Sequence, residues 1–312
     1  MIATPGGHVD EMYDLATRLF DADRDRIWIT ARTAQTESLL RDERVEFVPA
    51  VAARQGFKAL KSLPTALKLM RSLDPSLVVS TGAALAVPYL YAARALRLPT
   101  RYIESATRMK SPSITGRLVS VLPGVSLNHQ ARDWQLDKWN AMGSVFDIYT
   151  HAPTTAEHPD LVDMNIVVSF GTEKFPFERG RDRIQAALDG VDDVLWQLGT
   201  TPSRADLSGR QAELVPYDEL MDAIVAADVV VTHAGVGSIL SVLRAGKCPV
   251  VLPREERHGE HVDDHQVELS KILVQRGLAV MVGPDDDVAQ AIDRALDVKI
   301  SQRAIDDAFH LD

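Results

Sequence analysis

The sequence has almost no cysteine and no long apolar run, and both shortages narrow the class of protein. Cys248 is the one cysteine among 312 residues, so no disulfide can form within the chain, as is usual in a reducing compartment. The apolar segment 76–98 is interrupted by Pro88 and by arginines, and it falls short of the roughly 20 apolar residues of a membrane span. We expect no secretory signal, because the first residues lack its pattern. We therefore expect a globular, cytoplasmic protein.

Aromatic residues are also scarce, and the charge is unevenly distributed. The net charge is −10 and aromatic residues make up 6% of the chain, yet residues 50–130 contain 11 lysines and arginines against Asp74 and Glu104. One basic region in an acidic protein suggests a localised anionic partner. Because few aromatic side chains interleave with the basic ones, we expect no nucleic acid to be that partner.

Short apolar runs alternate with helix-length amphipathic stretches along the whole chain. Continuous Val/Ile runs joined by helices predict parallel sheets covered on both faces. We therefore predict an α/β fold of two doubly wound domains, 1–155 and 161–312, with the polar stretch 150–160 as the linker. The predicted strands are 26–30, 45–49, 76–80, 100–104, 165–171, 193–199, 228–235, 248–253 and 278–283, and helices are predicted at 57–73 and 83–98, each starting or bending near its proline.

Three predicted strands end in glycines before a helix. Glycine can adopt positive φ and leaves room for a bulky ligand, and free N–H groups at a helix start attract anions. Ser238 is a candidate cap for the helix after the third strand. Since ligands of doubly wound sheets lie at the carboxyl ends of strands, these turns predict a phosphate or diphosphate site; ordinary tight turns are the alternative. The turns are Gly6–His8, Gly171–Thr172 and His233–Ser238.

The stretch 253–273 is rich in polar and charged residues beside a predicted strand end. Asp264, His265 and Gln266 carry groups that can pair with sugar hydroxyls, although a solvated polar loop before a capped helix is the alternative. The spacing of His258, His261 and His265 suggests metal ligands, but acidic residues interleave without an evident ligand geometry. We therefore expect no metal site here.

These motifs resemble those of a known enzyme family. The stretches "VSFGTEKFPFERGRDRI", "VVVTHAGVGSIL" and "GEHVDDHQVELSKIL" resemble the catalytic subunit of the two-subunit N-acetylglucosaminyltransferase of the dolichol pathway and its bacterial relatives. The stretches "PGGHVDEMYDL", "DPSLVVSTGAALAVP" and "RYIESATRMKSPSITGRLV" resemble its partner subunit, in the order of a fused protein. More distantly, the layout resembles the peptidoglycan N-acetylglucosaminyltransferase, a GT-B enzyme.

The resemblance implies a GT-B fold, with two Rossmann-like domains facing across a cleft, and an inverting, metal-independent glycosyltransferase. It implies a UDP-sugar as co-substrate, no other cofactor, and a C-terminal domain that binds the donor. We expect His8 to be the catalytic base, with Glu104 as the second candidate, and Gly6 and Gly7 to bind the acceptor. The donor-binding residues would be Gly171, Thr172, Phe175, Val215, Tyr217, His233, Ala234, Gly235, Gly237, Ser238, Asp264, His265 and Gln266.

The expected acceptor is a lipid-diphosphate-linked saccharide used in cell-surface polysaccharide assembly. Only Met1–Thr4 precede Pro5, so the first strand is short or the true start lies upstream. We expect no counterpart of the N-terminal membrane helix of the eukaryotic partner subunit. We therefore expect peripheral attachment to the inner face of the cell membrane, through an anionic surface contacted by residues 50–130. A UDP-sugar epimerase and a non-catalytic nucleotide-sugar-binding subunit remain alternatives.

Overall fold

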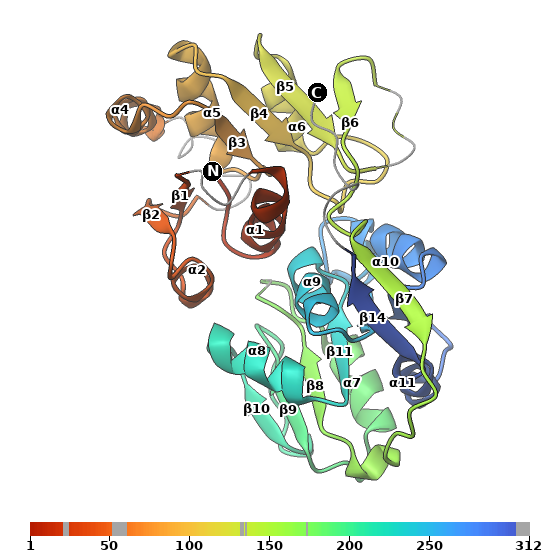
Figure 1. Cartoon of the computed structure of the whole chain (residues 1–312). Coiled ribbons are helices and arrows are strands. Elements are labelled where there is room, and N and C mark those ends of the chain that lie inside the picture. The colour runs from red at the N-terminus through yellow and green to blue at the C-terminus, as the bar shows by residue number, and fades with distance from the viewer. Residues whose placement is uncertain (21–24, 52–60, 132–133, 135, 173, 304–312) are drawn as a thin grey trace. The chain divides into compact units, whose positions relative to one another are not determined.

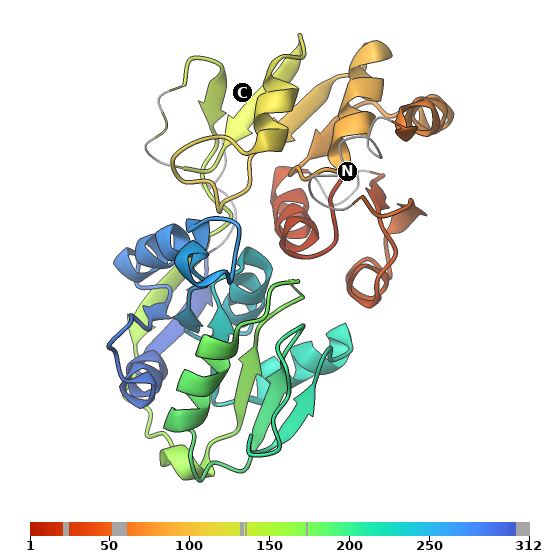
Figure 2. The same cartoon turned by 180° about the vertical axis from the view of Figure 1, so that it is seen from behind.

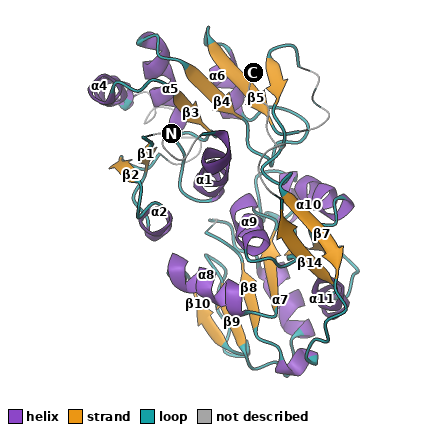
Figure 3. Cartoon of the chain, in the orientation of Figure 1, coloured by secondary structure: helices purple, strands orange, loops and turns teal. Residues whose placement is uncertain are grey.

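The computed structural model describes residues 1–20, 25–51, 61–131, 134, 136–172 and 174–303, which fall into two compact units. The first unit spans Met1–Asp147 and the second Ile148–Ala304. Each unit combines parallel strands with helices (Figures 1 and 3).

The first unit is built on parallel strands, with β1 beside β2 and the order β3-β4-β5-β6 in a second group. Ile2 forms one parallel bridge to Ile29 and another to Ser80, so it joins the two groups at the centre. The chain thus starts in the middle and winds to both edges, as a doubly wound fold does. The elements are α1 Gly7–Leu19, β1 Ile27–Thr30, α2 Ala34–Leu39, β2 Arg44–Phe47, α4 Leu63–Leu73, β3 Val78–Ser80, α5 Ala86–Ala95, β4 Thr100–Ile103, α6 Ile114–Ser120, β5 Val125–His129 and β6 Trp139–Ala141.

Helices α4, α5 and α6 pack in series on the first unit. Helix α5 is apolar on most sides and buries Tyr89 and Leu90 against the core, whereas α4 buries only Ala66 and Met70. Pro64 lies in the first turn of α4, where its missing N–H costs no helical hydrogen bond.

The second unit contains a six-stranded parallel sheet of order β10-β9-β8-β11-β12-β13. Helices α8 and α9 lie together on one face, and α7 and α11 on the other (Figures 1 and 2). A separate antiparallel pair joins β7 to β14. The elements are β7 Tyr149–Pro153, η1 Leu161–Asp163, β8 Ile166–Ser169, α7 Glu178–Ala187, β9 Val194–Gln197, β10 Arg210–Ala212, α8 Tyr217–Ala226, β11 Val229–His233, α9 Val236–Arg244, β12 Val250–Leu252, η2 Glu256–His258, α10 His265–Gln275, β13 Val280–Met281, α11 Val288–Leu296 and β14 Val298–Gln302.

The strand order of the second unit reverses between β8 and β11. From β8 the chain first moves outward through β9 and β10, then returns to β11 and moves the other way through β12 and β13. Every residue of β11 is buried because helices cover both faces of the sheet. Ligands of doubly wound sheets bind outside the carboxyl ends of the strands at such a reversal. Here those ends are Ser169 and His233.

The structure confirms the predicted α/β fold and corrects one boundary. Residues 150–153 belong to β7, which pairs with β14, so the predicted linker at 150–160 is wrong for its first four residues. The assignment of acceptor and donor binding to separate domains stays a prediction. Among the described residues, no helix is both long and apolar enough to cross a bilayer. Part of the predicted helix 57–73, with Lys58, lies outside the described residues.

Candidate functional site

His233 ends β11, and its imidazole is packed between two glycines. A Cβ added at Gly235 or at Gly171 would lie less than 3.0 Å from ring atoms of His233. Both positions must therefore lack a side chain for the imidazole to stay where it is. Gly171 also has φ +67°, a conformation that side chains disfavour. Gly235 has φ −81°, so the need for glycine there comes from the close approach of the ring and not from a positive φ.

The environment of His233 keeps the imidazole neutral. Burial lowers the pKa of His233, and the positive charge of Arg254 and, to a smaller extent, His261 and His265 add to this effect, so that the pKa is about 3. The backbone of Ser169 opposes these effects. A neutral imidazole at pH 7 can donate one hydrogen bond and accept another, but it brings no charge of its own.

Arg254 supplies the positive charge at this end of the sheet. It follows β12, its side chain is 1% exposed, and its guanidinium lies over the ring of Phe177 at 4.8 Å. Nη2 donates to the carbonyl of Phe170 at 3.1 Å and Nη1 to that of Phe175 at 2.5 Å. The guanidinium therefore holds the loop after β8 while keeping a buried positive charge near His233.

Helix α9 begins directly after this cluster. Its N-cap is Gly235, and no side chain caps the first turn by a hydrogen bond. Ser238 is the third residue of the helix, so the prediction that Ser238 is the cap is wrong. The first N–H groups of a helix have no partner within the helix and carry a partial positive charge. Together with Arg254, they make the carboxyl ends of β8 and β11 favourable to an anion.

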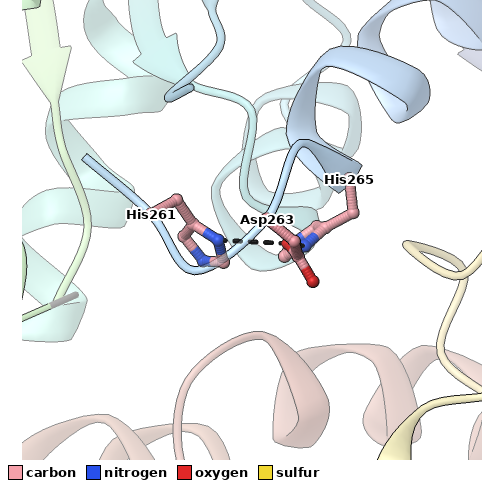
Figure 4. Close-up of side chains that lie close together, drawn as sticks. All are labelled: His261, Asp263 and His265. Carbon is pink, nitrogen blue, oxygen red and sulfur yellow. Dashed lines mark hydrogen bonds and ion pairs between the residues drawn. The ribbon is translucent and has the colours of Figure 1, made fainter. Parts of the chain in front are cut away.

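The segment before α10 contributes the predicted sugar-binding residues. Gln266 is buried, and its Oε1 accepts the backbone N–H of Arg254 at 3.1 Å. Asp264 is exposed and accepts the N–H of Glu256 at 2.8 Å. The Nδ1 of His265 contacts Asp263 Oδ1 in a close interaction (Figure 4).

The other predicted donor-binding residues lie on several different elements of the second unit. The ring of Phe175 lies 6.0 Å from that of His261, and Thr172 is exposed at the tip of the same loop. Val215 is buried and donates its N–H to Gln197 Oε1 at 3.1 Å. Tyr217 starts α8, and its hydroxyl accepts from Arg244 on α9 at 3.5 Å. The remaining two, buried Ala234 and Gly237, lie at the β11–α9 junction.

In the first unit, the predicted acceptor turn lies at the start of α1. Gly6 is the N-cap with φ +93°, so glycine is favoured there, and its N–H donates to Gln35 Oε1 at 2.7 Å. Gly7 and half-buried His8 form the first turn of the helix, and the carbonyl of His8 accepts from Thr81 at 3.0 Å. This turn follows Ile2, the central position of the parallel strands.

Two buried glutamates lie in the same unit. Glu104 is 1% exposed, and its Oε2 accepts both the N–H and the hydroxyl of Ser113, at 2.9 and 3.1 Å. Burial raises the pKa of Glu104. These contacts anchor the segment that leads into α6, so a structural role accounts for this carboxylate; its role as a base stays an untested prediction.

Sequence reasoning missed Glu11 and Arg254. Glu11 lies on α1 three residues after His8, is fully buried, and accepts the N–H of Ala106 at 2.7 Å and the Nε2 of Gln130 at 2.5 Å. Burial raises the pKa of Glu11 to about 7, against the effect of these hydrogen bonds. The positions of the two residues were the available signal. Glu11 lies one helical turn beyond the Gly6–His8 motif, and Arg254 lies two residues beyond the end of β12.

Comparison with known proteins agrees with this architecture. Residues 193–308 match the glycosyltransferase family 28 C-terminal domain. The crystal structure of Acinetobacter baumannii MurG superimposes with a TM-score of 0.57 at 20% identity, covering 94% of this chain and 88% of that one. The chain has the GT-B fold, and residues 193–308 resemble a glycosyltransferase domain. The matched family domain includes β11, α9 and Arg254.

Curated relatives extend over both units. The UDP-N-acetylglucosamine--N-acetylmuramyl-(pentapeptide) pyrophosphoryl-undecaprenol N-acetylglucosamine transferase of Chlorobaculum tepidum is 26% identical over 242 residues, 71% of this chain and 63% of that protein. The chain thus spans less than two thirds of this relative. The protein of the same name from Alcanivorax borkumensis is 24% identical over 343 aligned residues, covering 99% of this chain and 93% of that one.

A similarity to a subunit of the dolichol-pathway enzyme covers a short segment. The UDP-N-acetylglucosamine transferase subunit ALG13 of Yarrowia lipolytica is 35% identical over 71 residues, 23% of this chain and 34% of that subunit. A fusion of the two dolichol-pathway subunits therefore stays a hypothesis.

Proposed function

We propose that this glycosyltransferase moves a sugar from a UDP-sugar to a lipid-diphosphate-linked saccharide in cell-surface polysaccharide assembly. The proposal that a UDP-sugar is the donor rests on the cluster at the β8–β11 reversal. There neutral His233, buried Arg254 and the start of α9 favour an anion. The transferases similar to this chain act, by their names, on a UDP-linked donor and a pyrophosphoryl-undecaprenol acceptor.

The proposed chemistry is an inverting displacement without a metal ion. The acceptor hydroxyl attacks the anomeric carbon, the bond from that carbon to the diphosphate oxygen breaks, and UDP leaves with the electron pair. The N–H groups at the start of α9 and the field of Arg254 would stabilise the negative charge that develops on the leaving diphosphate. We propose that His8 removes the proton of the acceptor hydroxyl, because an unperturbed histidine in general titrates near neutrality.

The membrane part of the proposal rests on the surface of the first unit. Three large apolar side chains are exposed on and just after α6: Ile114 at 71%, Leu118 at 46% and Val121 at 72%. They are one helical turn apart and lie beside exposed Arg117. An apolar stripe with basic neighbours suits the interface of an anionic bilayer, where each apposed Lys or Arg contributes about 1 kcal/mol. We propose peripheral attachment to the inner face of the cell membrane.

The donor proposal is tested by thermal unfolding with and without UDP. A ligand that binds only the folded state raises the melting temperature by mass action. UDP should stabilise the wild type, and His233→Ala should lose most of that effect. His158→Ala, which removes an exposed histidine of the same unit, is the matched control. Equal UDP-induced shifts in all three proteins would contradict the diphosphate assignment.

The membrane proposal is tested by flotation with liposomes. The wild type should bind vesicles with anionic lipid at low salt and neutral vesicles weakly. Lys61→Glu combined with Lys68→Glu and Ile114→Asp should release it, whereas Lys271→Glu, an exposed change in the other unit, should not. A wild type that ignores anionic vesicles at low salt would indicate a soluble acceptor.

A further inference from the structure

Three metal-ligating side chains converge in the segment between η2 and α10. His261, Asp263 and His265 alternate along the chain, and their ligand atoms all lie within 4.8 Å of one another. Figure 4 shows the two imidazole rings on either side of the Asp263 carboxylate. The rings stand nearly perpendicular, with centroids 4.5 Å apart.

The spacing between His261 and Asp263 matches that of two ligands around a small divalent cation. Zinc binds histidine nitrogen and carboxylate oxygen at about 2.0–2.1 Å, so two ligands at the tetrahedral angle are about 3.3 Å apart. The Nδ1 of His261 lies 3.2 Å from Asp263 Oδ1. The Nδ1 of His265 contacts that same oxygen. The three ligand atoms therefore converge, and a cation between them would require Asp263 Oδ1 and His265 Nδ1 to move apart, for example by rotation of the Asp263 carboxylate.

The burial of His261 provides a second, independent observation. Its side chain is only 8% exposed. Its Nδ1 is buried and makes no hydrogen bond of acceptable geometry with any residue that the structure describes, although Asp263 is close. A buried imidazole nitrogen without a hydrogen bond is costly. A cation placed between the three side chains would bind this nitrogen directly.

We propose that His261, Asp263 and His265 form a zinc site with two nitrogen ligands, one carboxylate oxygen and a fourth position open to water. Two imidazoles and one carboxylate suit zinc better than magnesium or calcium, which prefer oxygen ligands. The sequence-based expectation that this stretch holds no metal included His258, which lies exposed on η2 and is not part of the cluster. The site shares His265 with the predicted donor-binding residues, but the displacement chemistry of the proposed sugar transfer itself requires no metal.

The test is a zinc titration of the metal-free full chain against a chromophoric chelator. The wild type should bind one equivalent of Zn²⁺. Asp263→Asn, which keeps the shape of the side chain, and His261→Gln should each weaken binding about tenfold or more. His258→Gln, which changes an exposed histidine three residues from the cluster, is the matched control and should bind like the wild type.

Thermal unfolding and the spectrum of bound Co²⁺ provide two further tests of the site. Thermal unfolding without metal shows whether each variant is folded, and Zn²⁺ should raise the melting temperature of the wild type but not that of Asp263→Asn. Substitution by Co²⁺ should give the visible spectrum of a tetrahedral site in the wild type. Equal zinc affinity in the wild type and both ligand variants, or less than one equivalent bound to the wild type, would overturn the site.

Discussion

Replacement of Gly235 by alanine tests how closely the glycine turn is built around His233. A Cβ at this position would lie less than 3.0 Å from the imidazole, and Gly171 also lies close to the ring. The ring is buried, so it has little room to move away. Overpacking of this kind costs about 1–3 kcal/mol. Alanine also restricts the unfolded chain more than glycine does, which raises the free energy of unfolding by about 0.4–1 kcal/mol. The net expected loss is about 0–2.6 kcal/mol of the free energy of unfolding.

The decisive assay is a double-mutant cycle measured by urea titration. In a His233→Ala background the clash is absent, so Gly235→Ala should cost only the preference of the α9 N-cap for glycine over alanine. The two changes should therefore couple by about 1–3 kcal/mol. Gly283→Ala is the control, because its new Cβ would meet only the exposed carboxylate of Asp286, which can rotate away. Additive effects of the two substitutions would refute the packing argument.

Three further predictions concern activity and pH. Sugar transfer should survive EDTA, and a loss restored by magnesium or manganese would place the enzyme in another mechanistic class. His8→Ala should lower kcat about 10²–10⁴-fold while UDP-induced stabilisation stays intact, and near-normal turnover would remove His8 as the base. Glu11 has its pKa raised from 4.5 to about 7, so the folded state binds more protons than the unfolded state between these values. Stability should fall as pH rises through this range, by up to about 1.4 kcal/mol per unit, and Glu11→Gln should flatten the urea-derived profile; an unchanged slope would contradict the burial of this carboxyl group.

Strands buried on both faces were predictable because their sequences are continuous runs of Val and Ile. The run at 228–231 became β11, at the centre of its sheet. Edge strands were not predictable in the same way. Strand β10, Arg210–Ala212, is polar and short, and β7 pairs with β14, whose residues lie about 150 positions away. Their strand character comes from tertiary partners rather than from local sequence.

The sequence predicted the candidate site only where the backbone requires glycine. Glycines after a strand located the turn around His233, although Ser238 was wrongly expected to cap α9, which begins with Val236. Arg254 and Glu11 were missed because their importance depends on burial, which a charged residue does not reveal locally. The convergence of His261 with Asp263 depends on the path of the loop before α10.

The most direct test of the central claim is transfer of a radiolabelled sugar from a panel of UDP-sugars, with and without a bacterial membrane extract. The account predicts label in the lipid-extractable fraction only when enzyme, one UDP-sugar and the extract are all present, and loss of that label in His233→Ala. Conversion of a UDP-sugar without any acceptor would instead indicate an epimerase. Binding of UDP with no turnover of any donor in the presence of the extract would contradict the proposal of a lipid-directed glycosyltransferase.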